Sequence, residues 1–119
     1  MFVATVILAA VIGGVFIMAG VAKLAKHPAM VRAREHLGLP ETLFAMVGGL
    51  EVLGGMGVLL GLHEDLPVIG VLASVGLIGI TIGATRYHQQ AGDAMKDWLP
   101  AVAMGSLCIF FIIMRVATA

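Results

Sequence analysis

One carboxyl group stands out in the sequence because of the apolar residues on both sides of it. Glu51 is the only charged residue between positions 42 and 62, and in a helix it would lie roughly 13 Å from the start of that run. A charge near the centre of a membrane is costly, so such a carboxyl is paired, protonated or turned towards a wet cavity. Two interpretations stay open. Glu51 either handles a proton or anchors a ligand in an intramembrane pocket, or it is a structural carboxyl bound to Lys23, Arg86 or hydroxyl groups.

The other reactive residue types offer little chemistry. Cys108 is the single cysteine, which excludes an intramolecular disulfide and a thiolate metal site, and its apolar neighbours predict a buried, inert thiol. The histidines match no metal-ligand spacing, and the eight methionines are typical of pliable packing. No nucleophile–base pair or phosphate-binding loop is evident. We therefore expect no catalytic residue and no metal site, and a binding or structural protein rather than an enzyme.

The amino-acid composition indicates whether the chain lies in water or in lipid. Hydrophobic residues make up 61% of the 119 residues and charged residues 12%, whereas soluble domains are about 45–50% apolar and about 25% charged. A chain of this length cannot hide so much apolar surface from water, because small domains leave much of their surface exposed. Seven basic residues balance seven acidic ones, so no nucleic-acid partner is expected. The predicted partner of most of the surface is the lipid bilayer.

Four runs are long and apolar enough to cross a bilayer, at residues 2–22, 42–62, 67–85 and 99–115. The first begins without the basic segment of a secretory signal, so we expect it to be a retained helix. Pro67 and Pro100 suit first helical turns, and Arg115 is expected to extend to the membrane interface. The prediction is an all-α, polytopic four-helix bundle that forms a single domain over residues 1–119.

The connections between the spans predict the orientation of the chain. Residues 28–39 have near-helical apolar spacing, which predicts a short interfacial helix ended by Gly38 and Pro40. Residues 86–97, which begin at Arg86, are predicted to be a polar loop. Most Lys and Arg residues lie in the first connection, residues 23–41, and in the third, residues 86–97. Because such residues concentrate in cytoplasmic loops, we expect both connections to face the cytoplasm and both termini to lie outside.

Glycine is the second organising feature, with 16 in the chain. Helices in lipid associate through close backbone approach at small residues. Helical spacing places Gly48 and Gly55 on the face of Glu51, and GxxxG steps recur in later spans. This pattern favours tight packing and a homo-oligomer. The glycines predicted to pack helices are Gly20, Gly48, Gly54, Gly55, Gly57, Gly61, Gly79 and Gly83.

Several of these motifs together resemble the DoxX-like family of small membrane proteins. The string FIMAGVAKL at residues 16–24 is similar to the end of the first helix in that family. EHLGLP at residues 35–40, followed by GGLEVLGG at residues 48–55, is similar to the approach to the second helix and its glutamate. The resemblance implies a four-helix bundle in a bacterial plasma membrane. It also implies that Gly20, Lys23, Glu51, Gly54 and Gly55 are pocket or packing positions.

Two functional hypotheses follow. Some DoxX-like relatives are associated with membrane redox systems, which implies a non-catalytic accessory or scaffold subunit that presents a quinone-sized cleft to a redox enzyme partner. The thiol-oxidising chemistry of distant relatives is excluded, because Cys108 has no partner cysteine. The alternative is a stand-alone binder or carrier of a small hydrophobic molecule, with Glu51 fixing its polar end. A quinone or a lipid would be the bound molecule, and no covalent cofactor is expected.

Overall fold

The computed structural model describes residues 2–117, and these form five α-helices without a strand. The helices are α1 (Phe2–Leu24), α2 (Pro28–Leu37), α3 (Glu41–Leu60), α4 (Pro67–Gln90) and α5 (Met95–Ala117). Within this part of the chain, α1, α3, α4 and α5 are long and apolar enough to cross a membrane. The predicted all-α architecture of four spans with a short helix after the first is confirmed.

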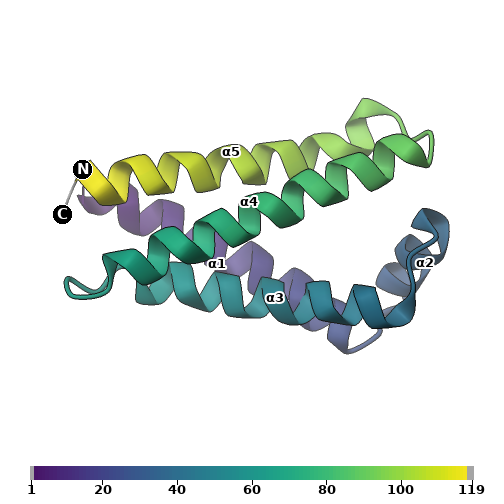
Figure 1. The fold of residues 1–119 in the computed structure, drawn as a ribbon, viewed down its shortest axis with the longest axis horizontal. Helices are drawn as coiled ribbons and strands as arrows, with labels where there is room; N and C mark the ends of the chain where they lie inside the picture. Colours follow the sequence, from purple (N-terminus) through teal and green to yellow (C-terminus); the bar gives the residue numbers. More distant parts are fainter. Residues whose placement is uncertain (1, 118–119) are drawn as a thin grey trace.

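The long helices run side by side, and the two ends of the bundle differ (Figure 1). α1 packs mainly against α3, α4 packs against α5, and α3 and α4 join the two pairs. The start of α1, the end of α5 and the turn at residues 61–66 lie at one end, called here the terminal end. α2 and the loop at residues 91–94 lie at the other, called the α2 end. The even number of spans therefore places both ends of the chain together.

Glycines in the left-handed conformation follow α2 and α4 at the α2 end. Gly38 has φ 70° and Gly92 has φ 78°. After α4, Gly92 N–H donates to Gln89 O and Asp93 N–H donates to His88 O. This is a Schellman motif, which satisfies carbonyls that the helix leaves unpaired. The predicted end of the short helix at Gly38 is confirmed, and the same motif fixes the direction in which Asp93 leaves α4.

The polar ends of the last two spans are more helical than the sequence predicted. α4 continues to Gln90, so Arg86 lies within the helix and not in a loop. α5 begins at Met95, so Pro100 stands inside the helix rather than in its first turn. Helical hydrogen bonding does not stop where the apolar run stops, because Gln and Lys are also good helix formers. An apolar run marks the part of a helix in lipid and not its full length.

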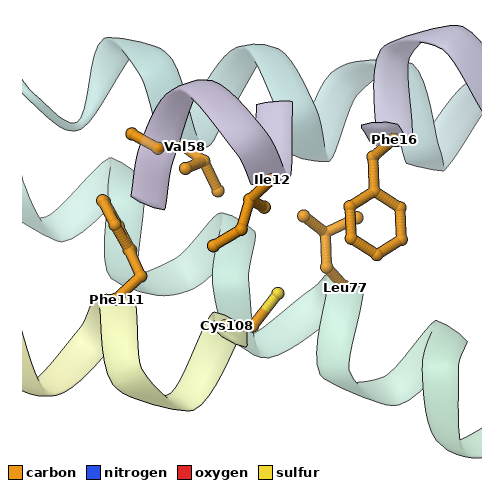
Figure 2. Packing of buried hydrophobic residues seen from close by; sticks show 7 residues of the cluster. Ile12, Phe16, Val58, Leu77, Cys108 and Phe111 are labelled. Carbon is orange, nitrogen blue, oxygen red and sulfur yellow. The ribbon is translucent and has the colours of Figure 1, made fainter. Parts of the chain in front are cut away.

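The apolar core lies where the four long helices meet. Ile12 and Phe16 of α1 face Leu77 of α4 and Cys108 and Phe111 of α5 across the bundle centre, with Val58 completing the cluster from α3 (Figure 2). These side chains are almost fully buried. Cys108 is a free cysteine within this cluster, the environment that its apolar neighbours predicted.

Arg115 closes the terminal end in a way that the sequence did not predict. Instead of extending to the membrane surface, its side chain is buried. Its Nε donates to Gly61 O at 2.7 Å and its Nη2 donates to His63 O at 3.1 Å. Carbonyl groups at a helix C-terminus lack partners within the helix and carry partial negative charge. The carbonyl groups at the end of α3 therefore stabilise the Arg115 cation in its buried position.

Candidate functional site

A cavity of about 530 Å³ lies between α2, α3 and α4 at the α2 end. Ligand pockets measure about 300–1,000 Å³ and are largely apolar, with a small number of polar groups that fix orientation. The apolar lining comes from Met30, Ala33, Leu37, Leu39, Leu43, Phe44, Val47, Ile80 and Ala84. The polar side chains in the lining are those of Lys23, Glu51, Tyr87 and His88. The cavity thus has both the size and the lining of a binding site.

Lys23 and Glu51 meet at the end of the cavity that lies deepest in the bundle. Lys23 Nζ lies 2.7 Å from Glu51 Oε1, and the two side chains are 14% and 6% exposed. Lys23 Nζ also lies 5.5 Å from the centroid of the Phe44 ring, a distance at which an ammonium group is attracted to an aromatic face. The pair is neutral as a whole, which removes much of the cost of a lone charge in lipid.

A glycine contact one helical turn away brings this pair together. Gly20 precedes Lys23 by three positions, and Gly48 precedes Glu51 by three positions, so each glycine lies on the face of its charged residue. A Cβ atom on Gly48 would lie 2.9 Å from Lys23 Cβ and 3.1 Å from Gly20 O. Larger residues at Gly20 or Gly48 would separate α1 from α3. The close approach of these helices is what allows Lys23 to reach Glu51.

Arg86, the other predicted partner of Glu51, lies elsewhere. It is an exposed residue of α4, and among residues 2–117 no ion pair joins it to Glu51. The next two residues, Tyr87 and His88, line the cavity instead. Of the three residues predicted for a polar site, the structure therefore brings together Lys23 and Glu51 and leaves Arg86 outside.

The predicted packing glycines fall into two groups. Close contacts occur where a Cβ atom would come within 3.0 Å of a neighbouring helix, at Gly20, Gly48, Gly54, Gly55, Gly57 and Gly61. Gly79 and Gly83 differ, since a Cβ atom on either would meet nothing within 4 Å. Both line the cavity. They do not pack helices within this chain, because the space in front of them is empty of protein.

A second polar cluster joins α2 to the end of α4 and the loop at residues 91–94, and sequence reasoning missed it. His36 Nε2 lies 2.6 Å from Asp93 Oδ1, and His88 Nδ1 lies 2.6 Å from Asp93 Oδ2. The hydrogen bond with His88, followed by that with His36, lowers the pKa of the Asp93 carboxyl. We call these three residues the His–Asp–His cluster. Because His88 also lines the cavity, the cluster ties α2 to the cavity wall.

The signal for this cluster was only partly present in the sequence. His88 and Asp93 are five residues apart in the sequence, and the Schellman motif at Gly92 brings the two residues close together. His36, however, lies 57 residues from Asp93, and no local pattern predicts that contact. Among residues 2–117, no group of His, Cys, Asp and Glu side chains is arranged to hold a metal ion.

Comparison with known proteins gives one match. The family model described as DoxX-like matches residues 4–111, a range that includes every residue lining the cavity. No curated protein and no solved structure matches the chain.

Proposed function

The chain belongs to the DoxX-like family, and we propose that this multi-pass membrane protein binds a small, largely apolar molecule beside the Lys23–Glu51 pair. The observation that carries the proposal is an apolar cavity of about 530 Å³ with that pair at its inner end. Protein interiors are normally packed as densely as organic crystals. This cavity departs from that packing and is partly open to its surroundings, so a small molecule can enter and fill it.

The two charged side chains suit one end of such a molecule. Lys23 offers N–H donors, and Glu51 offers carboxylate oxygens as acceptors. A polar head group placed between them finds a hydrogen-bond partner without the pair being separated. The apolar residues of α2, α3 and α4 then cover the remainder of the molecule. This arrangement would hold and orient a ligand.

Removal of the Glu51 charge tests this proposal. The protein is purified from its membrane in a mild detergent, and the small molecules extracted from it are measured by mass spectrometry. We expect one small hydrophobic molecule to be enriched with the wild-type protein and depleted with Glu51→Gln. Glu41→Gln is the matched control, because it is the same change in the same helix at a side chain that is 73% exposed and outside the cavity.

Two results would contradict the proposal. The first is a wild-type extract that contains only bulk membrane lipids in their usual proportions. The second is an enriched molecule that Glu51→Gln and Glu41→Gln retain equally. Thermal unfolding of each variant shows whether a loss of ligand reflects a loss of folded protein.

The role of the protein in a larger assembly is a separate prediction. The family resemblance predicts an accessory subunit of a redox system, and the GxxxG steps predict a homo-oligomer. No contact among residues 2–117 bears on the redox partner or on the oligomer. Mass spectrometry of proteins copurified from the native membrane tests both. A stoichiometric redox enzyme supports the accessory role, whereas a lone protein or oligomer that retains the molecule favours a stand-alone binder or carrier.

We also propose that the protein lies in a bacterial plasma membrane with the α2 end towards the cytoplasm. The basic residues near α2, including Lys26, Arg32 and Arg34, support this orientation. Introduced cysteines at His27 and Glu64 test it, because native Cys108 is buried. We expect a membrane-impermeant thiol reagent to label Glu64→Cys in intact cells. Labelling of His27→Cys instead would reverse the orientation.

A further inference from the structure

We propose that the cavity selects a slender, uncharged amphiphile with a hydroxyl or carbonyl head, and that Gly76, Gly79 and Gly83 of α4 set this selectivity. The inference rests on the proposed function and adds the chemical class of the ligand. It follows from three features of the described residues, which are the glycine face of α4, the length of the cavity and the neutrality of the Lys23–Glu51 pair.

The glycine face of α4 makes room that the fold itself does not require. Gly76, Gly79 and Gly83 are spaced three and four residues apart, so they share one side of the helix. All three line the cavity, and a Cβ atom on any of them would meet nothing within 4 Å. Alanine would favour the helix more than glycine does. The absence of side chains here leaves room for an occupant to lie directly against the α4 backbone.

The shape of the cavity restricts that occupant to a slender body. Its lining on α4 runs from Gly76 to His88, which corresponds to about 18 Å along a helix. Opposite this face, the lining from α3 begins at Leu43 and ends at Glu51. A space that is long in the helix direction and bounded by α2, α3 and α4 fits a single acyl chain or a single row of rings, with its head at Glu51.

The charged pair restricts the head group to an uncharged one. Lys23 and Glu51 have no net charge together, whichever atom holds the shared proton. A carboxylate or ammonium head would add an unbalanced charge to an apolar site in lipid, which is strongly unfavourable. A hydroxyl or carbonyl group can bond to the Lys23 N–H groups, and a hydroxyl can also donate to Glu51. Neutral heads are therefore bound in preference to ionised ones of the same length.

Two matched photoactivatable probes test the inference in lipid nanodiscs. One is a diazirine derivative of dodecanol, and the other is the corresponding dodecanoic acid with its head ionised. The labelled fraction is measured from intact mass, and the labelled peptide is identified after digestion. We expect the alcohol to label wild-type α3 or α4 at the cavity. We expect the acid to label it at least about ten-fold less, because its unbalanced charge is costly in lipid.

Gly79→Leu provides the steric test, and Gly14→Leu is its matched control. A Cβ atom on Gly14 would also meet nothing within 4 Å, but Gly14 is exposed on α1 and does not line the cavity. We expect Gly79→Leu to reduce labelling by the alcohol about ten-fold and Gly14→Leu to leave it unchanged. Gly79→Ala, expected to give an intermediate reduction, keeps the test valid if the leucine variant folds poorly.

The possible failures are distinguishable. If the acid labels the cavity as well as the alcohol does, or if both Gly79 variants label like the wild type, the inference is wrong. The proposed function still stands in that case, provided that Glu51→Gln loses the label and Glu41→Gln keeps it. If neither probe labels α3 or α4 at the cavity in the wild type, both the inference and the proposed function are overturned.

Discussion

At the terminal end, Gly61 and Gly70 bring α3 and α4 together, whereas at the α2 end Gly79 and Gly83 of the same α4 face a cavity. A Cβ atom on Gly61 would lie 2.7 Å from Gly70 N, but one on Gly83 would meet nothing within 4 Å. The first half of α4 therefore packs tightly against α3, whereas the cavity separates the second half of α4 from α3. The same residue type serves stability at one end and leaves room at the other.

The charged residues at the two ends differ in the same way. Arg115 is buried at the terminal end, where it donates to the backbone carbonyls of Gly61 and His63. Lys23 and Glu51 are buried at the α2 end, but they border an open space. Groups that bond to the protein backbone hold helices together, whereas groups beside a cavity remain available to a ligand. The terminal end is therefore closed by packing and backbone hydrogen bonds, whereas the Lys23–Glu51 pair at the α2 end joins two helices and also borders the proposed binding site.

The largest effect on stability is expected where a buried charge loses its partner. Lys23→Met leaves Glu51 without a cation in an apolar environment, which should lower the free energy of unfolding by about 3 kcal/mol. The double variant Lys23→Met, Glu51→Gln should recover most of this loss, because no lone charge remains. Equilibrium unfolding of both single variants and the double variant in detergent measures the coupling. Additive losses would show that the two side chains do not interact.

The next largest effect on stability is expected at a glycine that contacts a neighbouring helix, and a glycine that faces the cavity should show no such loss. Gly61→Ala should lower the free energy of unfolding by about 2 kcal/mol, because the added methyl group forces α3 and α4 apart. Gly79→Ala should leave stability unchanged or raise it by about 0.5–1 kcal/mol, since alanine is the better helix former and the space is open. Thermal and chemical unfolding of the two variants provide the measurement. Equal destabilisation by both changes would refute the contrast between the two ends.

A smaller loss is expected at the terminal end when the guanidinium is removed. Arg115→Met leaves the carbonyl groups of Gly61 and His63 without these donors, which should cost about 1–2 kcal/mol. The cost is moderate because water at the bundle end can replace part of the hydrogen bonding. The change should leave the extracted ligand unaffected, since Arg115 lies outside the cavity. A variant that kept its stability but lost the ligand would reverse the roles assigned to the two ends.

The smallest effect concerns the His–Asp–His cluster and depends on pH. Hydrogen bonds from His88 and His36 lower the pKa of Asp93, so its carboxylate stabilises the folded state above the ordinary aspartate pKa of about 3.9. This contribution is lost as the pH falls through the lowered pKa of the folded protein. The difference in Tm between the wild type and Asp93→Asn should therefore shrink as the pH falls below about 4. Parallel Tm curves down to low pH would contradict this.

The sequence predicted the features that depend on local spacing. Apolar runs predicted the four spans, and Gly38 predicted the end of α2. The isolated position of Glu51 predicted a paired or protonated carboxyl or one that faces a wet cavity, and Lys23 was one of the candidate partners. Each of these follows from the residues of one segment or from the cost of a charge in lipid. The helix ends were less predictable, because α4 and α5 extend into polar residues that hydropathy assigns to a loop.

The features that depend on which helices face each other were not predictable. Gly61 and Gly83 both occur in GxxxG steps, yet only the fold shows that one meets a backbone and the other a cavity. His36 and Asp93 are similarly separated by two whole spans, α3 and α4. Arg115 looked like an interfacial residue because its backbone partners are 52 and 54 residues away. In each case the decisive neighbour belongs to another helix.

Native mass spectrometry of the intact wild-type protein tests the central claim most directly. The protein is released from membrane-derived nanodiscs, and the mass that remains bound to each protomer is measured. If the cavity is a binding site, one organic molecule of constant mass should be bound per protomer, and Glu51→Gln should reduce its occupancy while Glu41→Gln does not. A protein that carries no bound molecule, or a mixture of lipids in the proportions of the membrane, would contradict the account.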